Sequence, residues 1–223
     1  MCGRLAMKNY NLLNKLKDKF FNSGETGNNQ VDNVSEKGKD YYNKVFDELE
    51  MFHVHYTSSP YYGVWTVILD RIRHIRKGSI LEIGCGTGQL AWALYDSNLA
   101  NDYIGFDFSE VAIKYARRLC PKLKFLLANA METDLYETFN YDIVISTEFL
   151  EHVELDIDVI KSIRAGATFI GSVPNYPFRS HIRHFSDIME VINRYSEYFT
   201  SFEVIPIRVY ETKIIYLFQG VKN

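Results

Sequence analysis

The chain has 223 residues, a formal net charge of −3 and 47% hydrophobic residues. This length suits one domain with an elaborated end, and the hydrophobic content supplies a sizeable core. The slightly negative charge implies no global attraction to nucleic acid. Cys2, Cys85 and Cys120 show neither a pairing pattern nor a metal spacing, which favours a reducing compartment. No apolar run is long enough for a transmembrane segment and no signal peptide is recognisable, so we expect a cytoplasmic protein.

The first 76 residues are predicted to be helical on either side of a polar linker. Residues 9–21 alternate apolar and basic side chains, a pattern typical of an amphipathic helix that packs on the domain, a partner or a membrane surface. Residues 22–39 are rich in Asn, Gly, Ser and charge and read as the linker. Residues 40–76 predict two helices, the second beginning near Ser59-Pro60. The dense aromatic and histidine side chains of residues 53–65 favour a lid over a pocket rather than a core stripe.

From residue 77 onward, predicted strands and helices alternate. The expected strands are 80–83, 103–106, 124–127, 141–146 and 167–173, and the expected helices between them are 89–97, 109–119, 131–138 and 155–164. The chain then gives a helix at 186–197 and two strands at 202–210 and 213–219. Only Glu211-Thr212 separates these two strands, so they form an antiparallel hairpin. The pattern predicts an α/β fold: a Rossmann-like, doubly wound, seven-stranded sheet with an antiparallel terminal hairpin and a helical N-terminal extension.

A glycine-rich turn follows the first of these strands, in the stretch Ile80-Leu81-Glu82-Ile83-Gly84-Cys85-Gly86-Thr87-Gly88. The glycines allow positive φ and let a ligand touch the main chain, and the free N–H groups of the next helix attract negative charge. Asp107 ends the next strand, 107 − 88 = 19 residues after Gly88. An acid at about this offset meets ribose hydroxyls. The third glycine comes one residue too early for the dinucleotide pattern G-x-G-x-x-G.

This stretch closely resembles motif I of the class I S-adenosylmethionine (SAM)-dependent methyltransferases, and the resemblance extends from about Gly78 to the C-terminus. It implies a methyltransferase with SAM as cofactor. Together with the patterns of the first 76 residues, it divides the chain into an N-terminal helix and linker (1–39), a helical lid (40–76) and a methyltransferase domain (77–223). By the same resemblance, the methionine, ribose and adenine of SAM would be held by Gly84, Gly86, Gly88, Asp107, Phe108, Asn129 and Ala130. Asn129 stands where the family often has Asp, so an amide replaces a charge at the adenine edge.

A second motif, Glu148-Phe149-Leu150-Glu151-His152, follows the fourth predicted strand, and ligands bind beyond such strand ends. His181 and His184 follow the fifth strand. The combination is similar to the ubiquinone-pathway O-methyltransferases and the small-RNA terminal 2′-O-methyltransferases. In those families, E-x-x-E-H and a distal His bind a divalent ion that activates a hydroxyl. His181 matches the distal His better than His184, so the resemblance implies Mg²⁺ or Mn²⁺ on Glu148, Glu151, His152 and His181.

Other interpretations of this motif stay open. Without a metal, His152 or His181 would act as a general base beside Glu148, or the two glutamates would be structural. Methyl transfer depends mainly on alignment, but a hydroxyl acceptor must also lose a proton, which a histidine or a metal can assist. We therefore expect O-methylation of a small-molecule or glycan-like acceptor. An N-methyltransferase, a terminal RNA methyltransferase and a non-catalytic SAM-binding protein are the alternatives. The negative net charge argues against the terminal RNA methyltransferase. A non-catalytic SAM-binding protein is disfavoured because a buried polar cluster is costly unless it has a function. The sequence does not indicate the oligomeric state.

Overall fold

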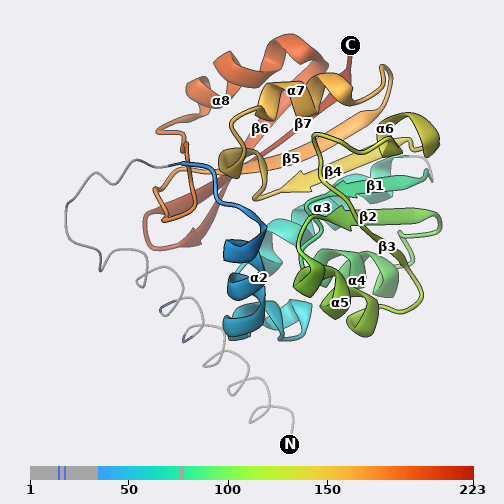
Figure 1. Cartoon of the computed structure of the whole chain (residues 1–223). Helices are drawn as coiled ribbons and strands as arrows, with labels where there is room; N and C mark the ends of the chain where they lie inside the picture. The colour runs from blue at the N-terminus through green and yellow to red at the C-terminus, as the bar shows by residue number, and fades with distance from the viewer. Residues whose placement is uncertain (1–14, 16–17, 19–34, 76–77) are drawn as a thin grey trace, which may run out of the picture.

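The computed structural model describes residues 15, 18, 35–75 and 78–223. Apart from Lys15 and Asp18, the predicted helix at 9–21 lies outside the described residues, and so does most of the linker at 22–39. The strands are β1 (Ile80–Ile83), β2 (Tyr103–Asp107), β3 (Lys124–Leu127), β4 (Ile143–Thr147), β5 (Thr168–Pro174), β6 (Phe199–Tyr210) and β7 (Lys213–Lys222). They form one seven-stranded sheet in the order β3-β2-β1-β4-β5-β7-β6 (Figure 1).

The sheet is parallel except at its C-terminal end. Strands β1 to β5 pair in parallel, whereas β7 is antiparallel to both β5 and β6. The predicted doubly wound sheet with its terminal hairpin is therefore confirmed. Strand β6 begins at Phe199, three residues earlier than predicted, because the register shifts between Thr200 and Glu203 and interrupts the alternation of side chains.

The helices connect these strands in the predicted order. They are α2 (Lys39–Glu48), α3 (Tyr62–His74), α4 (Gln89–Asp96), α5 (Glu110–Leu119), α6 (Leu135–Thr138), α7 (Asp156–Ser162) and α8 (Ile188–Tyr195). Short 3₁₀ turns lie at Glu50–Phe52, Tyr56–Ser58, Leu150–His152 and Ser196–Tyr198. Helix α5 begins at the predicted N-cap, where the Ser109 side chain accepts the N–H of Ala112. No helix among the described residues is both long enough and apolar enough to cross a membrane.

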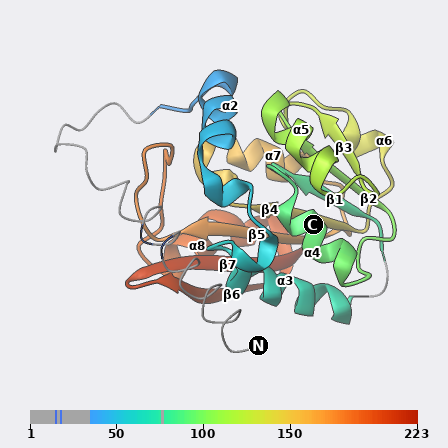
Figure 2. The ribbon, with the colours of Figure 1, turned by 90° about the horizontal axis from the view of Figure 1, so that it is seen from below.

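Helices cover both faces of the sheet, and each face has its own hydrophobic core. On one face α3, α4 and α5 pack through residues such as Ile68, Leu94 and Ile113. On the other face α7 and α8 pack through Val159 and Val191. Helix α2 packs beside α5 (Figures 1 and 2). Two helical layers leave only the strand ends open to a ligand.

An ion pair between the buried Asp156 carboxylate and the partly exposed Arg194 holds α7 and α8 together behind the turn at Leu150–His152. The Asp156 carboxylate accepts two hydrogen bonds from Arg194, at 2.8 and 2.7 Å, and one from the Tyr195 hydroxyl at 2.9 Å. Arg183 lies 3.5 Å from the same carboxylate and donates to the carbonyls of Leu150 and Val153. The pair therefore helps to fix the backbone of the second sequence motif.

Candidate active site

The glycine-rich turn between β1 and α4 has the backbone that its sequence predicts. Gly84, Gly86 and Gly88 have φ values of 68°, 51° and 80°, a region that disfavours other residues. A Cβ on Gly84 would lie 2.6 Å from the Phe149 ring, and one on Gly88 would lie 3.0 Å from Cβ of Ala116. The turn therefore requires glycine for both conformation and space.

Asp107 at the end of β2 joins this turn to the start of α5. Its Oδ2 accepts the N–H of Gly86 at 3.0 Å, and its Oδ1 accepts the N–H of Ser109 at 2.8 Å. Burial raises the pKa of Asp107 to about 6, although these N–H groups favour the charged form. Each carboxylate oxygen can accept a further hydrogen bond, so a ribose hydroxyl can still be held here.

A cavity of about 670 Å³ opens beyond these strand ends, within the range typical of small-molecule sites. It is bordered by the glycine-rich turn, the loops after β2, β3, β4 and β5, and helix α2. The predicted residues that line it are Gly84, Gly86, Asp107, Phe108, Asn129, Ala130, Glu148, His152 and His181. Gly88 is not part of the lining, because it packs against Ala116 of α5.

Glu82 also lines the cavity, and the sequence prediction gave it no role. It lies within β1 and is buried, and the Tyr103 hydroxyl donates to its Oε2. Burial raises the pKa of Glu82 to about 8, since the charged form is poorly solvated there. An acidic residue inside an otherwise apolar strand was the available signal.

Glu148 begins the loop after β4 in an unusual conformation, with φ at 50°. The Ser172 hydroxyl of β5 accepts its N–H at 3.0 Å and donates to its Oε1 at 2.9 Å. Its Oε2 is buried and has no hydrogen-bond partner among the described residues. Burial raises the pKa of Glu148 to about 7, so this carboxyl can gain or lose a proton near neutral pH. A strained backbone of this kind is common at functional sites.

Two histidines and a carboxylate lie together beside Glu148. Single ligand atoms of Glu151, His152 and His181 lie within 4.8 Å of one another. The Nδ1 atoms of His152 and His181 lie 2.9 and 3.0 Å from the carbonyls of Ser180 and Tyr176. Because a carbonyl only accepts, both Nδ1 atoms carry the proton, and each Nε2 keeps a free lone pair. We call these three residues the Glu–His–His cluster.

Burial sets the charges of the Glu–His–His cluster. It lowers the pKa of His152 to about 4 and that of His181 to about 3, so both imidazoles are neutral at pH 7. Burial and the nearby Glu148 charge raise the pKa of Glu151. Neither oxygen of the buried Glu151 carboxylate has a hydrogen-bond partner among the described residues. Unsatisfied buried carboxylates are rare in proteins unless a ligand or ion completes them.

The structure brings together three of the four predicted metal ligands. Glu148 is not within this group, because its side chain turns to Ser172. His184, the alternative to His181, is exposed and borders a separate surface hollow with Arg194.

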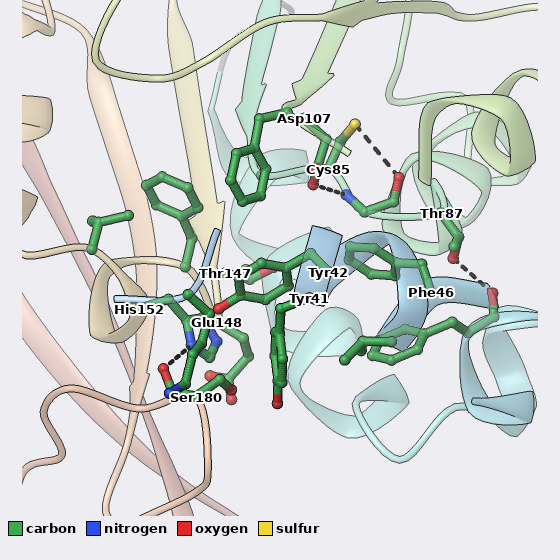
Figure 3. A pocket seen from close by; sticks show the side chains of 18 of the residues that line it. Tyr41, Tyr42, Phe46, Cys85, Thr87, Asp107, Thr147, Glu148, His152 and Ser180 are labelled. Carbon is green, nitrogen blue, oxygen red and sulfur yellow. Dashed lines mark hydrogen bonds between the residues drawn. The ribbon is translucent and has the colours of Figure 1, made fainter. Parts of the chain in front are cut away.

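Helix α2 closes one side of the cavity through Tyr42 and its neighbours, to which the sequence analysis assigned no role in the site. Figure 3 shows Tyr42 lying between Asp107 and the pair Glu148 and His152. The Tyr42 ring centroid lies 5.4 Å from that of Phe108 and 5.7 Å from that of His152. The next residue, Asn43, accepts a 2.7 Å hydrogen bond from the Ser109 hydroxyl at the start of α5.

The segment after α2 is tied to the glycine-rich turn by side chains of α4 and the turn itself. Gln89 donates to the carbonyls of Met51 and Val54 at 3.0 and 2.8 Å, and Thr87 donates to that of Phe52 at 2.7 Å. Gln89 is buried, so its amide has exchanged water for these two carbonyls. The N-terminal helices thus border the same cavity as the glycine-rich turn.

The class of protein follows from the fold and this turn: the chain has the class I fold of the SAM-dependent methyltransferases. Residues 80–165 match the family model described as Methyltransferase domain (Methyltransf_25). Residues 80–165 therefore belong to a methyltransferase domain, set within the fold of the SAM-dependent methyltransferases. No curated protein sequence matches the chain.

Solved structures of several methyltransferases share this fold. One is magnesium protoporphyrin IX methyltransferase (ChlM) from Synechocystis PCC 6803 with bound SAM, with a TM-score of 0.62 and 17% identity over 83% of this chain and 95% of that chain. Another is the N-methyltransferase NodS from Bradyrhizobium japonicum WM9 with S-adenosyl-L-homocysteine, with a TM-score of 0.64 and 15% identity over 82% and 97%. A third is the methyltransferase domain of bacterial CtHen1-C, with a TM-score of 0.58 and 16% identity over 74% and 100%. At these identities the likeness is one of fold.

Proposed function

We propose that the protein transfers the methyl group of SAM to an oxygen of a small-molecule or glycan-like acceptor. One observation carries this proposal. Neutral imidazoles and unpartnered buried carboxylates gather beyond the end of β4, beside the cavity that the glycine-rich turn borders. Holding SAM does not require such groups, whereas removing a proton from an acceptor does.

The other half of the cavity supplies groups that suit SAM. Gly84 and Gly86 leave the main chain open to its methionine and ribose, and Asp107 offers lone pairs to the ribose hydroxyls. Phe108 and Ala130 border the place expected for the adenine. Asn129 accepts the N–H of Met131 at 3.1 Å through Oδ1, which leaves its amide N–H₂ to donate to a ring nitrogen.

The chemistry requires one bond exchange and one proton transfer. The acceptor oxygen attacks the methyl carbon, so a C–O bond forms while the C–S bond breaks and its electrons return to sulfur. S-adenosylhomocysteine leaves uncharged, and the acceptor proton passes to the protein. Glu148 lines the cavity with a pKa near 7, so it can receive and hold the proton. The neutral Nε2 of His152 can accept a hydrogen bond from the acceptor hydroxyl and so orient it.

The Glu–His–His cluster also fits a divalent ion such as Mg²⁺ or Mn²⁺. Each histidine is fixed through Nδ1 to a backbone carbonyl, an arrangement typical of metal ligands, and the Glu151 carboxylate lacks any other partner. Glu151, His152 and His181 would hold the ion, with Glu148 beside it. When bound, a divalent ion acts as a Lewis acid that lowers the pKa of an acceptor hydroxyl.

N-methylation is the second candidate, and one observation favours it. Unpartnered buried carboxylates attract an ammonium group, and the fold is shared with an N-methyltransferase. An amine acceptor needs less help in losing its proton, so N-methylation would not explain why two neutral histidines lie beside the cavity.

Isotope-labelled SAM distinguishes these acceptors. The wild-type protein is incubated with oxygen acceptors (catechol, methyl glucopyranoside and uridine) and with the amines histamine and phenethylamine. We expect label on oxygen, and His152→Ala should abolish transfer without weakening S-adenosylhomocysteine binding. His184→Ala is the matched control and should keep full activity, because His184 lies outside the cluster. Transfer to amines alone, or to none of the five compounds, would contradict the proposal.

A further inference from the structure

The hydroxyl of Tyr42 is a buried donor without a partner. Its oxygen is inaccessible to solvent and makes no hydrogen bond to any described residue. The nearby Ser180 side chain favours the ionised form of Tyr42 less than burial opposes it, and by donor–acceptor geometry the hydroxyl has no partner. Burial, followed by the Glu151 charge, raises the pKa of Tyr42 well above its usual range, so the hydroxyl keeps its proton. A buried hydroxyl that donates no hydrogen bond destabilises the free protein. Such a group indicates a hydrogen-bond acceptor on a bound ligand.

The position of Tyr42 indicates what that role is. Figure 3 shows its side chain between Asp107, on the side expected for SAM, and Glu148 and His152 on the acceptor side. The ring packs edge-on against His152 at 5.7 Å between centroids. Oε2 of Glu148 is also buried and unpartnered, yet Tyr42 does not donate to it. Tyr42 and Glu148 thus both line the cavity, each with a buried polar atom that the other does not satisfy.

We propose that the Tyr42 hydroxyl donates a hydrogen bond to the acceptor oxygen that receives the methyl group, and so selects oxygen over nitrogen acceptors. This inference rests on the proposed transfer from SAM. It assigns a recognition role to a residue of α2, which lies outside the strand-end motifs.

The selectivity follows from a count of lone pairs. A neutral alcohol or phenol oxygen has two, so one can attack the methyl carbon while the other accepts the Tyr42 hydrogen bond. A neutral amine nitrogen has one lone pair, which the attack uses. Tyr42 therefore orients an oxygen nucleophile and gives an attacking nitrogen no such help.

Neighbouring contacts hold Tyr42 in this position. Asn43, the next residue, is bound to Ser109 at 2.7 Å. The rings of Tyr41 and Phe46 pack against Tyr42, with centroids 5.2 and 6.3 Å away. A donor fixed before the acceptor arrives loses little entropy on binding it.

The first test measures stability and needs no acceptor. Tyr42→Phe removes an unpartnered hydroxyl, so the melting temperature of the free protein should stay unchanged or rise. Tyr141→Phe is the matched control, because Tyr141 is fully buried and its hydroxyl accepts the N–H of Arg164 at 3.0 Å. This control should melt at a lower temperature. A fall for Tyr42→Phe as large as that for Tyr141→Phe would show a structural hydrogen bond and overturn the proposal.

The second test measures methyl transfer with catechol, methyl glucopyranoside and histamine. In Tyr42→Phe we expect kcat/KM for the oxygen compounds to fall about tenfold, the usual effect of one lost hydrogen bond. The KM for SAM and the rate with histamine should not change. Unchanged oxygen transfer, or an equal fall with histamine, would contradict the role of Tyr42. If the wild type methylates none of these compounds, the proposed function fails, and the melting temperatures still decide whether the Tyr42 hydroxyl is structurally bonded.

Discussion

Ser172 and Glu148 are joined by two hydrogen bonds that run in opposite directions. The Ser172 hydroxyl accepts the backbone N–H of Glu148 at 3.0 Å and donates to its carboxylate at 2.9 Å. One small residue on β5 therefore fixes both the backbone and the side chain of the residue that follows β4. Because Glu148 has a positive φ, this support stabilises a conformation that a glutamate rarely adopts.

Replacing Ser172 tests this support. In Ser172→Ala the Glu148 N–H and Oε1 both lose their partner, which should lower the free energy of unfolding by roughly 1–3 kcal/mol. Methyl transfer should fall more than S-adenosylhomocysteine affinity, because Glu148 borders the acceptor end. Chemical denaturation and calorimetry measure the two effects. Ser162→Ala, at an exposed hydroxyl of α7, is the control and should change neither. An equal loss of cofactor affinity would show that Ser172 acts on the SAM end instead.

Cofactor binding should weaken in acid because of Asp107. Its carboxylate must be ionised to accept hydrogen bonds from Gly86, Ser109 and the ribose, and its pKa in the free protein is about 6. As the pH falls below 6 the protonated form dominates, so the affinity for S-adenosylhomocysteine should drop, approaching tenfold per pH unit. Titration calorimetry from pH 7.5 to 5 measures this slope. Asp107→Asn should bind weakly with little pH dependence, and a wild-type affinity that is constant over this range would refute the assignment.

Metal binding can be measured without a methyl acceptor. If Glu151, His152 and His181 hold a divalent ion, adding Mn²⁺ should raise the melting temperature of the wild type, since a ligand that binds the folded state stabilises it. His181→Ala should lose this response and His184→Ala should keep it. An identical response in the wild type and His181→Ala would place the ion elsewhere. No response in the wild type would leave the cluster to act through its imidazoles alone.

Residues 40–65 are expected to behave as a lid over the active site. Gln89 and Thr87 tie residues 51–54 to the glycine-rich turn, so a bound cofactor should stabilise both together. Hydrogen exchange of residues 40–54 should slow when S-adenosylhomocysteine is added. Gln89→Ala should speed exchange there while leaving α8 unaffected. Equal exchange in the free and bound protein would argue against a lid.

The Asp156–Arg194 pair should matter for stability and not for binding. Asp156→Ala leaves the partly exposed Arg194 without its carboxylate and the buried Tyr195 hydroxyl without its acceptor, so the free energy of unfolding should fall by roughly 1–3 kcal/mol. Urea denaturation measures this loss. Asp158→Ala, two residues further along α7 and exposed, is the control and should change it little. A variant that is as stable as the wild type would mean that the packing of α7 on α8 does not depend on the pair.

The sequence by itself determined the sheet, the glycine-rich turn and the place of Asp107 at the end of β2. Local rules suffice there: three glycines at alternate positions need a tight turn, Asp107 ends a short apolar strand, and Ser109 caps the next helix. Because parallel strands end at the same edge of the sheet, consecutive segments of the chain arrive at one place. The antiparallel hairpin followed from a two-residue connection, which leaves no room for a crossover.

Only the tertiary structure decided how the polar groups beyond β4 and β5 are arranged. His181 lies in the cluster with His152 and His184 does not, because the backbone after β5 buries His181 and exposes His184. It turned Glu148 toward Ser172, a residue 24 positions away. It also brought Tyr42 of α2 between Phe108 and His152. Contacts between residues so distant in the chain depend on the packing of separate elements, and no periodicity or spacing within one segment encodes them.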